Sequence, residues 1–191
     1  MPQKLSSTKI QYMDLEMQCW EDGIIPENQS NHIIQIGIVE IDANTLTISR
    51  KENYYVKPIN KNFEITEYCT NLTEISKELL LKEGRRFNEV METIKNEYSP
   101  RNKVSYSWGS DNDTIVEHCK IYNCNNPWKE TGIWDLGVIF QSTFLLKKKL
   151  TLGKALEFLN VPFNGTPHNA LWDAVSLADL HIEMMKRLRG L

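Results

Sequence analysis

Carboxylates interrupt apolar strand and helix patterns at three widely separated places in this chain. The three segments are MDLEM with Asp14 and Glu16, SWGSDND with Asp111 and Asp113, and PHNALWDA with His168 and Asp173. Desolvating a carboxylate is costly unless a positive charge neutralises it. A fold that packs these segments must therefore supply cations, and a set of oxygen ligands favours magnesium or manganese.

The first segment follows the two-residue period of a β-strand. Asp14 and Glu16 are two residues apart, so their side chains project from one face of the strand, about 6.6–6.8 Å apart along the chain. Met13, Leu15 and Met17 share the opposite face. The two carboxylates could therefore close on one ion, although a D-x-E pattern taken alone is a weak motif.

Hydrophobic periodicity predicts a layered α/β structure. Strands are expected over 9–17, 33–42, 45–56 and 103–108, with a loop over 21–31 where Gly, Pro and Asn gather. Helices are expected over 76–84, 87–98, 112–122, 133–146, 152–159 and 169–188, with Ser76 as an N-cap and Pro100 stopping the second helix.

The second acidic segment leaves two candidate ligands. Asp111 precedes Ile115, Val116 and Cys119 at spacings that pack one helix side, so it is the predicted ligand. Asp113 lacks that register and is the alternative. It is expected to act as an N-cap, a common structural role for an Asp at a helix start.

His168 and Asp173 are predicted to have different roles. Five residues of helix correspond to about 500° of rotation, which leaves two side chains about 140° apart. His168 follows Pro167 and is expected at the helix entrance, where its imidazole could accept a proton from water. Asp173 is expected inside the helix as a metal ligand.

Composition sets the remaining bounds. The 191 residues suffice for one core, and no apolar run suggests a secretory signal or a membrane span. The four cysteines form no CxxC pair and predict reduced thiols in a cytoplasmic protein.

The net charge of −3 becomes +1 once the four proposed metal-binding carboxylates are set aside. Basic residues cluster at 85–86, 147–149 and 186–189, and each cluster is interpreted as a solvated face.

The order and settings of these motifs resemble the DEDDh exonucleases of the RNase H-like superfamily. The resemblance spans roughly residues 8 to 188 and looks closest to the branch containing the histone-mRNA 3′ exonuclease and its small bacterial relatives. The segments that carry it are MDLEM, IIQIGIVEID, YCTNLTEIS, SWGSDND and GTPHNALWDA. The resemblance implies an RNase H-like α/β fold: a mixed five-stranded sheet with antiparallel first strands, flanked by helices, in a single domain over residues 1–191.

The resemblance also implies roles for the site residues. Asp14 would bridge two Mg²⁺ ions, for which Mn²⁺ could substitute, Glu16 and Asp173 would complete one site, and Asp111 would support the other. His168 would deprotonate the attacking water. Two departures from the family pattern are a second motif shortened by one residue and the replacement of small residues after the Glu by Met17 and Gln18.

The implied activity is 3′–5′ hydrolysis of single-stranded nucleic acid, with RNA preferred over DNA and nucleoside 5′-monophosphates as products. The expected partners are 3′ ends of single-stranded RNA or DNA, without a membrane. Met17 is a candidate base contact, although its strand parity also suits the core, and Trp20 could stack on a base. The alternatives are a DNA-directed exonuclease of repair or defence, an oligoribonuclease restricted to dinucleotides, and a non-catalytic nucleic-acid-binding module.

Overall fold

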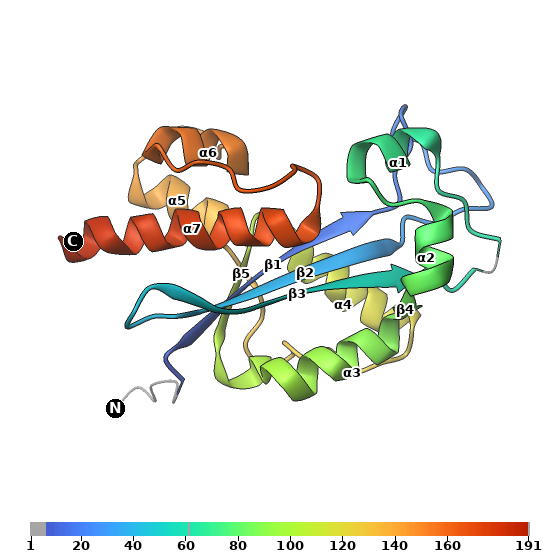
Figure 1. Cartoon of the computed structure of the whole chain (residues 1–191), viewed down its shortest axis with the longest axis horizontal. Coiled ribbons are helices and arrows are strands. Elements are labelled where there is room, and N and C mark those ends of the chain that lie inside the picture. Colours follow the sequence, from blue (N-terminus) through green and yellow to red (C-terminus); the bar gives the residue numbers. More distant parts are fainter. Residues whose placement is uncertain (1–6, 61, 191) are drawn as a thin grey trace.

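A mixed β-sheet organises the chain, and a computed structural model describes residues 7–60 and 62–190 (Figure 1). Its strand order is β4-β3-β2-β1-β5-β6. The strands are β1 (Lys9–Met17), β2 (Ile33–Asp42), β3 (Thr47–Lys57), β4 (Arg85–Arg86), β5 (Val104–Ser107) and β6 (Trp134–Asp135). β1, β2 and β3 pair antiparallel, whereas β5 runs parallel to β1. The mixed sheet and its antiparallel first strands are thus confirmed, but within the described residues the sheet has six strands and not the expected five.

Helices and one short 3-10 turn connect and cover the strands. They are α1 (Glu67–Thr73), α2 (Lys77–Glu83), α3 (Phe87–Tyr98), the turn Pro100–Asn102, α4 (Asp111–Ile121), α5 (Leu136–Thr143), α6 (Leu152–Leu159) and α7 (Ala170–Arg189). The hydroxyl of Ser76 accepts a hydrogen bond from the Leu79 amide at the start of α2, which confirms the predicted cap. No helix of the described part of the chain is long and apolar enough to cross a bilayer.

Two expectations about helices are wrong. The stretch 133–146 does not form one helix, because Trp134–Asp135 pairs with β5 and α5 then ends at Thr143. The helix α1 was not expected, because its seven residues are too few to show a helical period in the sequence. It begins where the Thr66 hydroxyl accepts a hydrogen bond from the Cys69 amide, a local N-cap.

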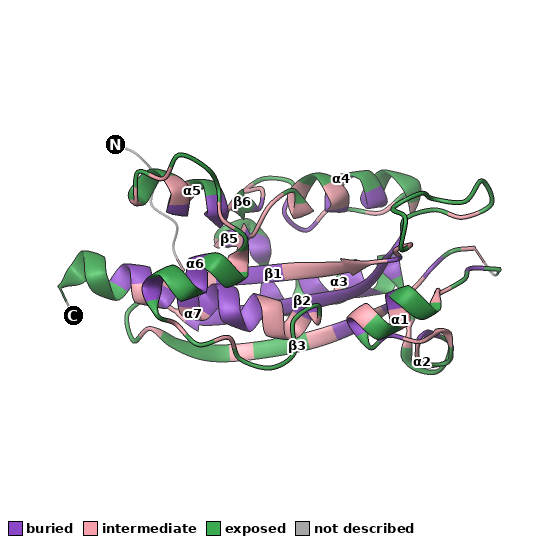
Figure 2. Cartoon of the chain, turned by 90° about the horizontal axis from the view of Figure 1, so that it is seen from above, coloured by how far each residue is buried: buried purple, intermediate pink, exposed green. Residues whose placement is uncertain are grey.

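The two faces of the sheet carry separate apolar clusters. Met13 belongs to the cluster that α3 and α4 complete, with Leu15 and Met17 packed against it. Tyr12, of opposite parity, belongs to the cluster that α7 completes. Figure 2 shows buried residues along most of α7 and along β2, whereas the first half of β3 is largely exposed. Strand alternation therefore directs Asp14 and Glu16 toward α7.

The start of α7 lies directly on the backbone of β2. Gly37 is the cross-strand partner of Asp14, and a Cβ at Gly37 would overlap the carbonyl group of Ala170. Beside it, Gln35 is fully buried and its Oε1 accepts a hydrogen bond of 2.9 Å from the Ala170 amide. Glycine thus permits the approach, and glutamine fixes the first residue of α7 over β1 and β2.

Replacing Gly37 with alanine should lower the free energy of unfolding by about 1–3 kcal/mol, because overpacking forces the backbone of α7 away from the sheet. The matched control is Gly153→Ala in α6, where an added Cβ meets nothing within 4 Å. That change should be neutral or stabilising by up to about 1 kcal/mol. Urea denaturation of both variants measures the difference, and equal stability of Gly37→Ala and the parent protein would contradict the close approach.

Candidate active site

Three of the predicted ligands converge where α7 crosses β1. Asp14 and Glu16 of β1 and Asp173 of α7 each offer a carboxylate oxygen, and these oxygens lie within 4.8 Å of one another. All three residues are half-buried. The strand and helix thus join residues separated by more than 150 positions, and the predicted juxtaposition of these three side chains is confirmed.

Burial and mutual repulsion disfavour the charged forms of these carboxylates. The pKa of Asp14 is raised well above its usual value by desolvation first, and then by the charges of Asp111, Asp173 and Glu16. Desolvation, followed by the charges of Asp173 and Asp111, raises the pKa of Glu16 to about 8. Like charges held this close stay ionised together only if cations offset them.

Asp111 joins the same electrostatic cluster from α4. Desolvation, followed by the charge of Asp135, raises its pKa to about 7, while Ser107 and Lys149 act in the opposite direction. Its Oδ2 is buried and has no hydrogen-bond partner among the described residues. A buried carboxylate oxygen without a partner is costly, so this atom is suited to a ligand that protein groups do not supply.

Asp113 lies apart from the cluster. Its side chain is exposed, and its charge is not among the causes of the raised pKa values of Asp14, Glu16 and Asp111. The expectation that it caps α4 is wrong, because α4 begins at Asp111 and Ser110 occupies the N-cap position. Asp113 instead lies in the first helical turn, where a negative charge favours the helix dipole.

His168 lies beside Asp173 but outside the helix. α7 begins at Ala170, and His168 adopts a left-handed backbone conformation with φ of 61°. Desolvation raises the pKa of Asp173, whereas the imidazole charge and the backbone amides of His168 and Asn169 oppose that rise. The predicted helix-entrance position is therefore confirmed, with an exposed side chain.

An aromatic ring supports the segment that carries His168. Gly165 has φ of 86°, and any Cβ there would overlap the ring of Trp172. The ammonium group of Lys51, a residue of β3, lies 4.7 Å from the centre of the same ring. The segment before α7 therefore rests on Trp172, the residue next to Asp173, so that helix and loop keep a fixed relation.

Asp135 is a site residue that the sequence patterns did not identify. Its Oδ1 accepts hydrogen bonds from the amides of Gly109 (3.1 Å) and Gly137 (2.8 Å), and its Oδ2 lies 2.9 Å from Lys149 Nζ. It thereby caps α5 and also holds the turn that leads to Asp111. An Asp before an apolar helix predicts the N-cap role, but no pattern in the sequence predicts the contact with Gly109.

The two predicted base contacts have different surroundings. Met17 packs against the apolar cluster under β1, as its strand parity predicts. Trp20 lies beyond the end of β1 and lines a cavity of about 480 Å³ with Glu21, Asp22, Thr66 and Tyr68. Tyr68 is 40% exposed, so the cavity offers two aromatic side chains. Contact of Met17 or Trp20 with a substrate stays a prediction.

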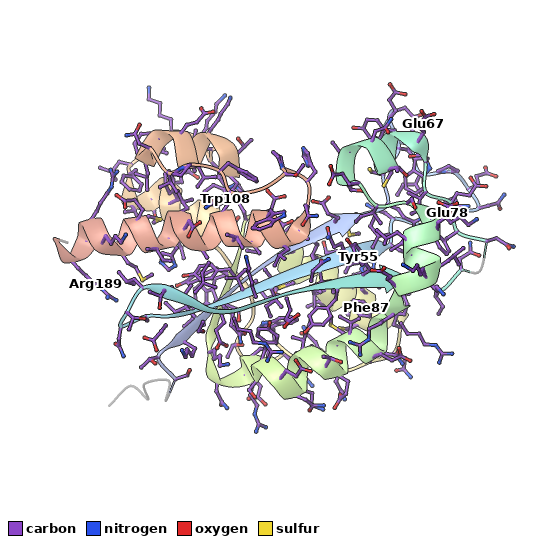
Figure 3. The ribbon with its side chains drawn as sticks, viewed as in Figure 1. Tyr55, Glu67, Glu78, Phe87, Trp108 and Arg189 are labelled. Atoms are coloured by element: carbon purple, nitrogen blue, oxygen red, sulfur yellow. The ribbon has the colours of Figure 1, made fainter. Side chains whose placement is uncertain are left out.

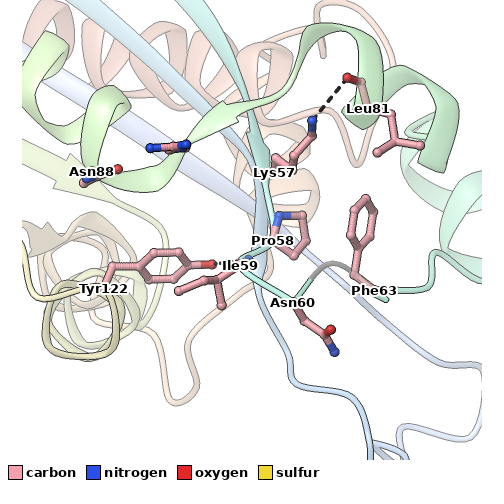
Figure 4. A pocket seen from close by; sticks show the side chains of 9 residues that line it. Lys57, Pro58, Ile59, Asn60, Phe63, Leu81, Asn88 and Tyr122 are labelled. Carbon is pink, nitrogen blue, oxygen red and sulfur yellow. Dashed lines mark hydrogen bonds between the residues drawn. The ribbon is translucent and has the colours of Figure 1, made fainter.

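A larger hollow of about 550 Å³ lies elsewhere, between β3, α2 and the end of α4 (Figure 4). Its nine lining residues include no carboxylate. Lys57 at its wall donates a hydrogen bond to the Leu81 carbonyl, and the Tyr122 hydroxyl accepts one from the Ile59 amide. This hollow therefore lacks the chemistry of the acidic cluster.

Known proteins share both the sequence pattern and the fold. A family profile described as an exonuclease matches residues 12–181. Two curated relatives are 22% identical over 91% of this chain: an "ERI1 exoribonuclease 2" of Xenopus laevis and a "3′-5′ exoribonuclease 1" of Mus musculus. The chain spans only 28% and 52% of the length of these relatives.

The fold matches a solved structure described as the nuclease domain of 3′hExo, a DEDDh family member, bound to rAMP. The TM-score is 0.85 at 19% identity, with 97% of this chain and 95% of that domain covered. The RNase H-like fold and the resemblance to DEDDh exonucleases are thus confirmed. With a family profile covering nearly its whole length, this chain belongs to the exonuclease family.

Proposed function

We propose that this chain is a metal-dependent 3′–5′ exonuclease that hydrolyses single-stranded nucleic acid, preferably RNA, and releases nucleoside 5′-monophosphates. The observation that carries the proposal is the convergence of Asp14, Glu16 and Asp173, with the charge of Asp111 acting on the same group. A purely structural role gives no reason to hold four carboxylates this close together. A pair of divalent cations would offset it.

The chemistry of the donors fits magnesium. All four side chains offer oxygen, and Asp111 Oδ2 is buried with no partner among the described residues. Desolvation, followed by the charges of neighbouring carboxylates, raises the pKa values of Asp14, Glu16 and Asp111, and bound cations would oppose both effects. Asp14, Glu16 and Asp173 would hold one ion, and Asp14 with Asp111 the second; Mn²⁺ should substitute. When bound, two such ions position water and phosphate in line and offset charge on the departing 3′ oxygen.

His168 is the proposed general base. Its imidazole nitrogen would take a proton from water, the hydroxide oxygen would bond to phosphorus, and the bond from phosphorus to the 3′ oxygen would break. The departing 3′ oxygen would take a proton from solvent and remain on the shortened strand as its new 3′-hydroxyl, while the nucleoside 5′-monophosphate leaves. The neighbouring carboxylate of Asp173 stabilises the resulting imidazolium by charge attraction. The exposed loop position of His168 gives the imidazole access to both solvent and the acidic cluster.

The preference for RNA rests on the relatives, which are named as exoribonucleases, and on a similar structure that holds rAMP. Trp20, with Tyr68 at its side, is the proposed stacking surface for a base, and Met17 a further contact. A cytoplasmic location and a single domain over residues 1–191 remain predictions of the sequence.

The metal-free protein should become less stable as the pH rises from 4.5 to about 8. The pKa of Glu16 is about 8 when folded, against 4.5 for a free side chain, so the folded state binds more protons between these values. The free energy of unfolding therefore falls with rising pH through this window. Asp111, with a folded pKa of about 7, adds to the same trend.

Magnesium should reverse this trend, because cations favour the deprotonated carboxylates. Thermal unfolding in EDTA and in Mg²⁺ across this pH range measures the effect, and the rise in Tm on adding Mg²⁺ should be larger at pH 8 than at pH 5.5. The control Asp14→Asn should show a smaller rise. A Tm that is independent of both pH and Mg²⁺ would remove the proposed metal site.

Amide substitutions should separate the proposed ligands from their neighbour. Asp14→Asn, Asp111→Asn and Asp173→Asn should each lower kcat by at least about 100-fold, since loss of a residue that merely orients a ligand already costs about 10–100-fold. Hydrolysis of a labelled oligoribonucleotide measures the loss, and circular dichroism checks the fold. Full activity in any of the three variants would remove that residue from the site.

Asp113→Asn is the matched control, since it makes the same change two residues from Asp111 on an exposed side chain. It should retain kcat within about twofold, as expected for surface substitutions. The opposite result, with Asp113→Asn inactive and Asp111→Asn active, would reverse the assignment of the second motif.

Polarity and sugar preference follow from one time course. Matched single strands of RNA and DNA, labelled at either the 5′ or the 3′ end, are incubated with Mg²⁺. Early release of the 3′ label as a mononucleotide and a ladder of shortening 5′-labelled strands are expected, faster for RNA. Faster loss of DNA supports the DNA-directed alternative, cleavage of dinucleotides alone supports an oligoribonuclease, and binding without cleavage supports a non-catalytic module.

A further inference from the structure

The three lysines between α5 and α6, Lys147 to Lys149, are anchored beside the second acidic motif. Lys149 Nζ lies 2.9 Å from Asp135 Oδ2, and the other oxygen of Asp135 accepts the Gly109 amide at 3.1 Å. Next along the chain, the Leu150 carbonyl accepts a hydrogen bond of 3.1 Å from Trp108 Nε1. Two adjoining residues of this lysine segment are thus tied to the turn that ends at Asp111.

The anchoring brings positive charge to the acidic cluster. The charge of Lys149 is one of the influences that lower the pKa of Asp111. Without cations, four carboxylates would repel a phosphodiester that approaches them, so nearby ammonium groups favour the approach of a polyanion. Lys149 acts on Asp111, which is one of these four carboxylates.

Lys147 and Lys148 are free to act on a ligand. Both side chains are exposed, and neither belongs to an ion pair or a side-chain hydrogen bond among residues 7–60 and 62–190. The hydrogen bonds of Lys149 and Leu150 fix the backbone next to them. Two unpaired cations are therefore presented from an anchored segment and not from a free loop.

The other basic clusters lie elsewhere on the molecule, and most of their arginines already have partners. Arg187 pairs with Glu183 and donates to the Leu159 carbonyl, and Arg189 donates to the Ala43 carbonyl. Figure 3 shows Arg189 at the far end of α7, about 24 Å from Asp173 at 1.5 Å per residue. At the opposite sheet edge, Arg85 donates to Thr93 and to the Glu89 carbonyl.

We infer that the lysine segment 147–149 binds the backbone phosphates of the single strand whose 3′ end enters the acidic cluster. Lys147 and Lys148 contact phosphates directly, and Lys149 is a positioning residue that ties them to Asp135. This inference rests on the proposed nuclease function, for which it names the path of the strand. The lysines contact phosphates only, so the same binding is expected for RNA and DNA.

The test is the salt dependence of binding, measured by fluorescence anisotropy with a 12-nucleotide single strand of RNA. The parent is the Asp14→Asn protein, which should bind without turnover. Lys147→Gln with Lys148→Gln should lower the slope of log Kd against log salt by about 1.4, or 0.7 for each lost contact. Relative to 1 M salt, this corresponds at about 0.1 M salt to a Kd about 25-fold higher. A DNA strand should give the same change.

The matched control is Lys186→Gln with Arg189→Gln, which removes the same charge at the far end of α7 and should leave Kd and the slope unchanged. An equal effect of both double variants would mean that only net charge matters and would overturn the inference. So would an unchanged slope in the Lys147 and Lys148 variant. Hydrolysis by the unmodified protein is scored separately, so failure of this binding path and failure of the proposed nuclease function are distinguishable.

Discussion

The contact between the first residue of α7 and the backbone of β2 is the constraint on which the site depends. Four like charges do not gather spontaneously, so other forces must hold their elements together. Gly37 lets α7 approach the sheet, and Gln35 accepts a hydrogen bond from the first amide of the helix. The apolar cluster between α7 and the sheet holds the helix in place against the strands. Hydrophobic burial, which scales with the area removed from water, outweighs the repulsion that this packing imposes.

The fold was predictable wherever a period was long enough to read. In β1, apolar and acidic side chains alternate from Met13 to Met17, and the side chains of α3 recur at helical spacing before Pro100, so both elements have the predicted bounds. β4 and β6 are two residues each, which is too short for any period. Their pairing depends on neighbours distant in the chain, so local pattern predicted four strands, and the expected fifth came from the family resemblance.

The site shows the same division between local and distant information. The shared strand face of Asp14 and Glu16 and the helix-entrance position of His168 were predictable because both follow from local spacing. The grouping of these residues with Asp173 was predicted only from the order of motifs that the chain shares with the family. Gln35 was missed because its partner, the Ala170 amide, lies 135 residues away. Asp111 and Asp113 are equally acidic in the sequence, and only the direction in which α4 presents them tells them apart, with one buried oxygen and one exposed side chain.

A chain with a net charge of −3 has no overall attraction for a polyanion, so charge placement must replace charge excess. Asp135 connects the two kinds of charge, because one of its oxygens holds the turn before Asp111 and the other holds Lys149. Negative groups that require cations and positive groups suited to phosphates are therefore fixed to one framework. Any motion of β6 would move both, so under the proposed function binding of the strand would be coupled to the geometry around Asp111.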